Sequence, residues 1–460
     1  MVNNQLSSAL AYNQENRARY LEELKALVRI PSVSTDPEAK ADMQRAAEWV
    51  AGQLRQLGMQ KVKIYPTPKH PVVYGENLKA GSEEPTVLIY GHYDVQPVEP
   101  LELWASPPFE PTQRGDNLYG RGASDMKGQV VITLKAVEAL VRTGELPINV
   151  KFIVEGEEEI GSPSLDNFIS THKDLLACDF ALNPDTGMIA ADTPTITYGL
   201  RGLAYFELRV SGPEHDLHSG IFGGVVHNPA QALCELIAGM HDSKGRVTLP
   251  GFYDSVRQLS EDERAELARL PMDKNFYLQQ TGAPALFGET GYTPAEQVGG
   301  RPTLEVNGLL SGFTAEGSKT VLPAKAMAKI SMRLVPDQDP EQVHQQLLKY
   351  LEQHAPPTIR WEVIKMAGGF ASVTDRSIPG VIALSKALEA TWGKRPLFKR
   401  EGGSVPVVDQ MYKILGVESV LTGFGLPDDN LHAPNEKIHV PTFYRGIEAM
   451  TRYLSILGES

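Results

Sequence analysis

Residues 87–94 read VLIYGHYD, an apolar run that ends in a histidine and an aspartate. A run this short and this rich in β-branched and aromatic side chains predicts a buried strand. Because alternate residues of a strand point to the same face, His92 and Asp94 leave its carboxyl end on one side. A neutral imidazole is a common metal ligand, and a carboxylate two residues on can fix its tautomer. Taken alone, the pair is also typical of an ordinary hydrogen bond.

More acidic residues follow at places where predicted elements end. The glycine-rich stretch Gly120–Gly128 places Asp125 in a loop that enters a helix over residues 129–142, where an aspartate would also serve as a helix cap. Residues 150–154 predict a second buried strand, which runs into four glutamates at positions 155 and 157–159. Ionised carboxylates this close repel one another, and a bound cation would remove that cost. A solvated acidic turn is the alternative.

Two later stretches repeat the pattern. Residues 179–185 are an apolar run that ends in Asp185, and residues 428–436 supply His432 in a polar loop. Each stretch alone fits ordinary loop chemistry. Together, two histidines and several carboxylates at strand ends are mixed nitrogen and oxygen ligands, which suit zinc, manganese or cobalt better than calcium or magnesium. The joint pattern predicts a transition-metal site.

With these motifs the chain resembles the M20 family of co-catalytic metallopeptidases, and its dipeptidase branch in particular, over nearly its whole length. The resemblance implies two divalent ions per subunit, with zinc expected first and manganese or cobalt as alternatives. It implies that His92 and Asp185 hold one ion. It further implies that Glu159 and His432 hold the other and that Asp125 bridges both. The bond from Asp125 to the next residue is expected to be a cis peptide.

The same resemblance implies the roles of the neighbouring acids. The Glu-Glu-x-Gly-Ser core of the family falls on residues 158–162, which makes Glu158 the general base and leaves Glu157 without a catalytic role. Asp94 matches the acid that orients the first histidine. The implied reaction is hydrolysis of the amide bond of a dipeptide or short peptide. A water shared by the two ions is the nucleophile, and Glu158 takes its proton.

A histidine-bearing loop in the middle of the chain carries a separate signal. Residues 216–220 read DLHSG and follow a strand-like run over residues 203–210. Their composition is that of a surface turn. In the dipeptidase branch this motif implies that His218 enters the active site of the partner subunit in a homodimer, where it stabilises the oxyanion.

Substrate contacts are also implied by resemblance. Arg333 ends a predicted strand, and its planar guanidinium suits the C-terminal carboxylate of a peptide substrate, although a strand-end arginine is often a surface ion pair. Thr320 is expected to assist, and Gly403 and Ser404 are expected to line the substrate pocket.

Composition excludes several classes of function. The net charge of -13 disfavours nucleic acid and anionic membranes as partners. No N-terminal signal pattern and no apolar run of about 18 residues occur, so we expect a cytoplasmic protein. The two cysteines, Cys178 and Cys234, lack metal or redox spacing and are expected to be reduced thiols in the core.

The order of predicted elements indicates two domains, as the length of 460 residues also does. Helices and strands alternate up to about residue 202, which predicts an α/β catalytic domain with a mostly parallel central sheet. Longer strands then predict an inserted α+β domain. We expect the catalytic domain to cover residues 1–204 and 372–460. The insert at 205–371, by resemblance, is a lid that also dimerises.

Other functions remain open at this point. An N-acyl-amino-acid amidohydrolase of the desuccinylase or acylase type shares the metals and the base, and differs in what the pocket accepts on the amine side. The motifs at residues 216–220, 333–336 and 401–404 favour a dipeptidase. A noncatalytic metal- or peptide-binding protein would not need Glu158. A nucleotide-binding oxidoreductase would need a third glycine after Gly122 and a distal acid, and both are badly placed.

Overall fold

The structure is a computed structural model that describes residues 2–403 and 405–459. The chain forms two compact units. The first unit contains the residues up to Tyr198, residues 374–398 and the residues from 406 on, and the second unit contains residues 199–373 and 399–405. The insert predicted over residues 205–371 falls within the longer segment of the second unit.

A mixed sheet forms the centre of the first unit, in the order β1-β2-β6-β3-β7-β17-β8. Its strands are β1 (Lys61–Tyr65), β2 (Val72–Asn77), β3 (Thr86–His92), β6 (Asn149–Glu155), β7 (Phe180–Asn183), β8 (Thr195–Leu200) and β17 (Ser419–Leu421). The four central strands β6, β3, β7 and β17 are parallel, and the outer pairs are antiparallel. The predicted α/β class is confirmed. The prediction of a mostly parallel sheet is correct only for its centre. At one edge, β1 and β2 are joined by a short connection, which only antiparallel strands permit.

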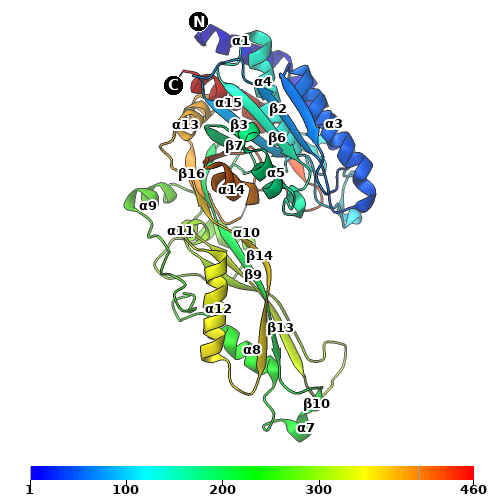
Figure 1. Ribbon diagram of the computed structural model, residues 1–460, viewed down its shortest axis with the longest axis vertical. Helices are drawn as coiled ribbons and strands as arrows, with labels where there is room; N and C mark the ends of the chain where they lie inside the picture. The colour runs from blue at the N-terminus through cyan, green and yellow to red at the C-terminus, as the bar shows by residue number, and fades with distance from the viewer. Residues whose placement is uncertain (1, 404, 460) are drawn as a thin grey trace. The chain divides into compact units, whose positions relative to one another are not determined.

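Helices cover this sheet, and Figure 1 shows them around β2, β3 and β6. They are α1 (Val2–Glu15), α2 (Arg17–Val28), α3 (Lys40–Gln56), α4 (Lys127–Thr143), α5 (Leu165–Thr171), α6 (Lys173–Leu176), α13 (Pro379–Trp392), α14 (Pro406–Gln410) and α15 (Val440–Leu457). α3 packs on β1 and β2, and α4 packs on β3. α4 is buried from Lys127 to Leu140, because α1, α2 and α15 also pack against it. A small antiparallel sheet joins β4 (Thr112–Arg114), β5 (Asn117–Tyr119) and β18 (Lys437–His439).

The second unit contains a four-stranded antiparallel sheet in the order β11-β13-β9-β14. The strands are β9 (Gly202–Ser211), β11 (Thr303–Ser311), β13 (Lys325–Leu334) and β14 (Arg360–Gly369). Burial alternates along β9 and β13, as expected for strands with one face on the core. α8 (Pro229–Ala238) and α12 (Pro340–His354) pack on these strands and close that core (Figure 1).

Shorter elements complete the second unit. They are β10 (Leu217–His218), α7 (Ser219–Phe222), α9 (Glu261–Leu267), α10 (Lys274–Thr281), α11 (Pro294–Gly300), β12 (Val321–Leu322) and β15 (Ser372–Val373). β16 (Leu397–Glu401) pairs with β8, and both strands continue from the first unit into the second. The residues at the start of α12 explain why the helix begins there. Asp339 caps the helix by accepting from the Glu341 N–H at 2.7 Å, and Pro340 occupies the first turn.

Two properties bear on the sequence predictions. In the described part of the chain, no helix is long and apolar enough to cross a membrane. Both cysteines are free thiols, but Cys178 is only half-buried and Cys234 is exposed. The prediction of core positions is therefore wrong for Cys234, because α8 buries Ala232, Leu233 and Leu236 and turns Cys234 outward.

Candidate metal centre

The side chains predicted as metal ligands meet at one edge of the sheet of the first unit. Because the four central strands are parallel, the loops after their carboxyl ends gather at that edge. His92 is the last residue of β3, and Glu159 lies in the short helix η3 (Glu158–Ile160) that follows β6. Asp185 follows β7 by two residues, and His432 lies in the loop after β17.

Asp125 stands between two groups of candidate cation ligands. Its Oδ1 lies 3.3 Å from His92 Nε2, and its Oδ2 lies 3.0 Å from His432 Nε2. Asp185 completes the first group, with its Oδ2 3.8 Å from His92 Nε2. Glu159 completes the second, with its Oε2 3.3 Å from His432 Nε2. Within each group the ligand atoms lie within 4.8 Å of one another, close enough to surround a single ion.

The surroundings of His92 fit a bound cation. The side chain is fully buried, and among the described residues its Nε2 has no hydrogen-bond partner of good geometry. Its Nδ1 lies 3.1 Å from the carbonyl oxygen of Asp94, which favours a proton on Nδ1 and a lone pair on Nε2. That lone pair faces the carboxylates of Asp125 and Asp185, so only a proton or a cation between them makes the arrangement favourable.

The loop that carries Asp125 does not use it as a helix cap. The N-cap of α4 is Met126, with no side-chain cap, so both carboxylate oxygens of Asp125 face the histidines instead. The peptide bond between Asp125 and Met126 is cis, as predicted. The loop also requires a glycine at position 122, where φ is +81° and a Cβ would lie 2.5 Å from Val95 Cγ1.

Asp94 supports both halves of the centre. Its carboxylate is fully buried, with Oδ1 3.4 Å from His92 Nδ1. The same carboxylate accepts hydrogen bonds from the backbone N–H groups of Glu158 at 3.3 Å and Glu159 at 3.1 Å. Asp94 therefore orients the turn that carries the glutamates as well as the imidazole, a contact that the sequence analysis did not anticipate.

The adjacent glutamates have separate surroundings. Glu158 belongs to neither ligand group. Burial raises the pKa of its carboxyl group to about 7. The charge of His92 lowers this pKa, whereas the charges of Glu159 and Asp125 raise it further. Glu157 has a structural role. Its carboxylate accepts from Thr67 Oγ1 at 2.7 Å and from the backbone N–H groups of His70 and Ser164.

One further contact was missed by the sequence analysis. Gln96, four residues beyond the first histidine, donates from Nε2 to Glu159 Oε2 at 2.8 Å. It thereby fixes the orientation of a candidate ligand. An amide side chain in a loop gives no periodic signal, and only its place after the His-x-Asp motif could have suggested it.

Electrostatics couple the candidate ligands. Burial disfavours the charged form of His92, but the carboxylates of Asp125 and Asp94 raise its pKa well above the ordinary value. Hydrogen bonds to Asp125 and Glu159 raise the pKa of His432 to about 10. Burial and the charge of Asp125 raise the pKa of Asp185. In the metal-free protein, protons therefore occupy the positions where cations would bind.

Cation binding should release protons, because an imidazolium cannot act as a ligand. We expect uptake of zinc or manganese by the metal-free protein at pH 7 to release one proton from each of His92 and His432, and apparent affinity to rise with pH. Calorimetry in two buffers with different ionisation enthalpies measures this release. Equal heats in both buffers would contradict the expectation. Without metal, the raised pKa of His432 stabilises the fold fully below about pH 6.5, and this contribution is lost as the pH rises toward 10.

The second unit holds His218 and Thr320 side by side. His218 is exposed at the end of β10, and it pairs with Val321 of β12. The N–H of Ser219 donates to the carbonyl oxygen of Thr320 at 3.1 Å. His218 Nδ1 accepts from the Gly220 N–H at 3.0 Å, so its proton lies on Nε2, which is the atom able to donate.

The other predicted substrate contacts also lie in the second unit. Arg333 is near the end of β13. Burial and then the charge of Arg333 lower the pKa of Arg201 to about 10, so the two guanidinium groups are neighbours. Arg201 Nε donates to the carbonyl oxygen of Gly402 at 3.4 Å, next to the exposed Gly403. Ser404 lies outside the described residues.

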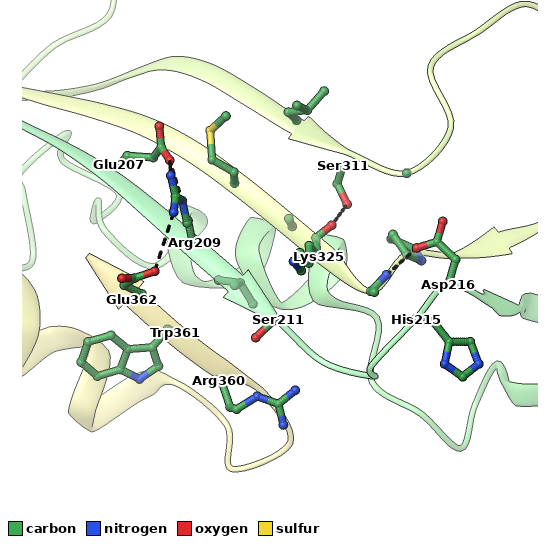
Figure 2. Close-up of a pocket in the computed structure, with 17 residues that line it drawn as sticks. Glu207, Arg209, Ser211, His215, Asp216, Ser311, Lys325, Arg360, Trp361 and Glu362 are labelled. Carbon is green, nitrogen blue, oxygen red and sulfur yellow. Dashed lines mark hydrogen bonds and ion pairs between the residues drawn. The ribbon is translucent and has the colours of Figure 1, made fainter. Parts of the chain in front are cut away.

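A groove with a volume of about 970 Å³ lies over β9, β13 and β14 of the second unit. Figure 2 shows Arg209 within it, paired with Glu207 and Glu362 on its two sides. None of the predicted site residues lines the groove. The predicted site residues gather at the metal centre instead, so the candidate site is there and not in this groove.

Fold and site together define a class of protein. Two groups of imidazole and carboxylate ligands share one aspartate at the carboxyl edge of a parallel sheet, with an acid beside them that belongs to neither group. This arrangement is that of a metal-dependent hydrolase. The model of peptidase family M20/M25/M40 matches residues 88–456. The chain belongs to this family and is a peptidase, as the motifs predicted.

Individual relatives match over almost their full length. The Cys-Gly metallodipeptidase DUG1 of Candida albicans is 31% identical over 473 residues, covering 97% of this chain and 96% of the relative. The human Beta-Ala-His dipeptidase is 30% identical over 469 residues, covering 97% and 92%. Among solved structures, the M20 family metallo-carboxypeptidase Sso-CP2 from Sulfolobus solfataricus has a TM-score of 0.85 at 33% identity, covering 96% of this chain and 99% of that one.

Proposed function

We propose that this protein is a dinuclear metallodipeptidase. The observation that carries the proposal is the shared Asp125, whose two oxygens face two separate groups of candidate ligands. Relatives named as dipeptidases, at 30–31% identity over nearly the whole chain, support a substrate of two residues. The donor set of two imidazoles and three carboxylates suits zinc, with manganese and cobalt as alternatives.

The residues of the first unit then divide the chemistry. When bound, two divalent cations would polarise the scissile carbonyl and lower the pKa of a water at the site. Glu158, which is outside both ligand groups, takes the proton of the attacking water and returns it to the leaving amine. Asp94 holds His92 and the backbone of Glu158 and Glu159 in place during that transfer. Gln96 does the same for the carboxylate of Glu159.

We further propose that the active form is a homodimer in which His218 completes the site of the partner subunit. Its exposed Nε2–H group is a suitable donor for the developing oxyanion. Apolar side chains near it, Ile221 and Val225, are 68% and 85% exposed. The edge strand β11 exposes Leu309 and Leu310, each 56% exposed. Exposure of apolar side chains and unpaired backbone groups on an edge strand is unfavourable in water. Contact with a second copy of the chain would cover them.

Arg333 should bind the C-terminal carboxylate of the substrate, with Thr320, Gly403 and Ser404 assisting. Arg333→Ala is expected to lower kcat/KM for dipeptides roughly 10- to 100-fold, mainly through KM, because a hydrogen bond to a charged group contributes about 1.5–3 kcal/mol. The variant should also lose the preference of the wild type for a free carboxylate over a C-terminal amide. Steady-state kinetics on both substrates measures this. Arg209→Ala on β9 is the control, and an unchanged preference in Arg333→Ala would contradict the role.

The substrate class is tested with metal-stripped protein. Zinc, manganese or cobalt is added back separately, and release of free amino acid is measured from a panel of dipeptides and from N-acetyl and N-succinyl amino acids. Metal-dependent cleavage of dipeptides with free amines is the expected result. Cleavage of only the N-acyl compounds would make the protein an amidohydrolase. No cleavage with any of the metals would leave a noncatalytic binding protein.

A further inference from the structure

A carboxylate that is not a candidate ligand holds the backbone of the Asp125 loop. Glu436 is fully buried. Its Oε2 accepts from Arg121 Nη1 at 2.7 Å and from the Gly122 N–H at 2.9 Å. Its Oε1 accepts from the N–H groups of Ser124 at 3.0 Å and Asp125 at 3.1 Å. One side chain therefore accepts from three backbone N–H groups of the loop and from a guanidinium.

A second acid makes a parallel connection. Asp429, also fully buried, accepts from Ser124 Oγ at 2.8 Å and from the Leu426 N–H at 2.8 Å through Oδ2. Its Oδ1 accepts from Lys437 Nζ at 2.9 Å. Asp429 precedes His432 by three residues and Glu436 follows it by four. Both ends of the loop that carries His432 are thus bound to the loop that carries Asp125.

The loop between these two acids has a backbone that needs such support. Asn430, His432 and Asn435 have φ values of 55°, 59° and 62°. Residues other than glycine seldom adopt this conformation, and it persists only where the surroundings impose it. Asn435 adds a further anchor, because it accepts from the Ala105 N–H and donates to the carbonyl oxygen of Leu103, each at 2.8 Å.

We infer that Glu436 is a positioning residue that, with Asp429, fixes Asp125 relative to His432, so that the second cation group (Asp125, Glu159 and His432) is assembled. The inference rests on the proposed dinuclear function. The group Asp125, Glu159 and His432 draws its members from three loops, and two of those loops are joined by the contacts of Glu436. Glu436 binds only backbone N–H groups and Arg121 in the described structure, so its effect on the reaction is through the ligands.

Glu436→Gln tests this inference with little change of shape. Glutamine has one carbonyl oxygen and one NH₂ group, so one of the two positions would present a donor to groups that are themselves donors. We expect the affinity for the second Co²⁺ ion to fall roughly 10- to 100-fold while the first ion binds almost normally, the range seen when a partner of a metal ligand is lost. The measurement is titration of the metal-free protein with Co²⁺, followed by visible absorption and calorimetry.

The matched control is Glu289→Gln. Glu289 is a buried acid of the second unit that accepts from Arg301 Nε at 2.7 Å and from Nη2 at 2.9 Å. Its replacement should lower thermal stability but leave both Co²⁺ affinities unchanged. If Glu436→Gln is not recovered folded, Ser124→Ala takes its place. This variant removes the hydroxyl that donates to Asp429, and we expect the affinity for the second ion to fall several-fold.

The outcomes separate this inference from the proposed function. If the wild type binds two Co²⁺ ions and Glu436→Gln binds both with unchanged affinities, the inference is overturned and the dinuclear proposal is not. If Glu436→Gln cannot be recovered folded, unchanged affinities in Ser124→Ala have the same meaning. Wild-type binding of a single ion would overturn the dinuclear site and this inference with it. Selective loss of the second ion in the variant, but not in Glu289→Gln, supports it.

Discussion

Replacing Glu158 with glutamine is expected to lower kcat on the order of 10²- to 10⁴-fold, because general base catalysis contributes that much. The amide cannot take the proton of the attacking water. Both ligand groups should persist, since Glu158 belongs to neither. Kinetics and elemental analysis of metal content on one sample measure the two properties together.

The neighbouring Glu157→Gln is the control for this variant. Glu157 holds Thr67, His70 and Ser164, so its replacement should lower the melting temperature and leave kcat of the folded enzyme nearly unchanged. A Glu158→Gln enzyme that has lost a metal ion would show that Glu158 is a ligand. One that retains both ions and full turnover would exclude it as the base.

Replacing His218 with alanine is expected to lower kcat on the order of 10²- to 10³-fold, the contribution of one preorganised oxyanion donor. The change removes the Nε2–H donor of an exposed side chain, so stability and metal content should be unaffected. His227→Ala is the control, since His227 is a partly exposed histidine of the same unit whose Nδ1 pairs with Thr358 Oγ1. Equal losses in both variants would contradict the proposed role.

Mixing the two inactive variants tests where His218 acts. In a mixed dimer, the subunit with His218→Ala retains Glu158 and can receive the intact His218 of a Glu158→Gln partner. If subunits exchange freely, half of the dimers are mixed and each has one complete site, so about a quarter of the wild-type activity should return. Subunit exchange must first be demonstrated independently. If exchange occurs and no activity returns, His218 acts within its own subunit.

Much of the centre was predictable because its signals are local. His92 and Asp185 follow apolar runs short enough to be strands, and parallel strands bring such ends together. The pairing of ligands and the role of Glu158 came from resemblance to a family and not from spacing. The cis bond at Asp125 was predicted in the same way and is present.

The rest could not be predicted because it depends on contacts between distant residues. Arg121 and Glu436 are 315 positions apart, and no periodic pattern connects them. The second role of Asp94 depends on the exact turn that η3 makes after β6. The antiparallel outer strands of the sheet follow from connections whose direction the alternation of helices and strands does not reveal.

The position of β17 in the sheet sets the order in which the centre can form during synthesis. The candidate ligands His92, Asp125 and Asp185 have all been made by residue 185, whereas the second candidate group waits for His432. β17 adds to β7 only after the second unit has been translated. Because domains fold largely as they emerge, a nascent chain holds one complete ligand group and lacks the other. Both candidate groups are therefore complete only after β17 has joined β7 and the loop that carries His432 has followed it.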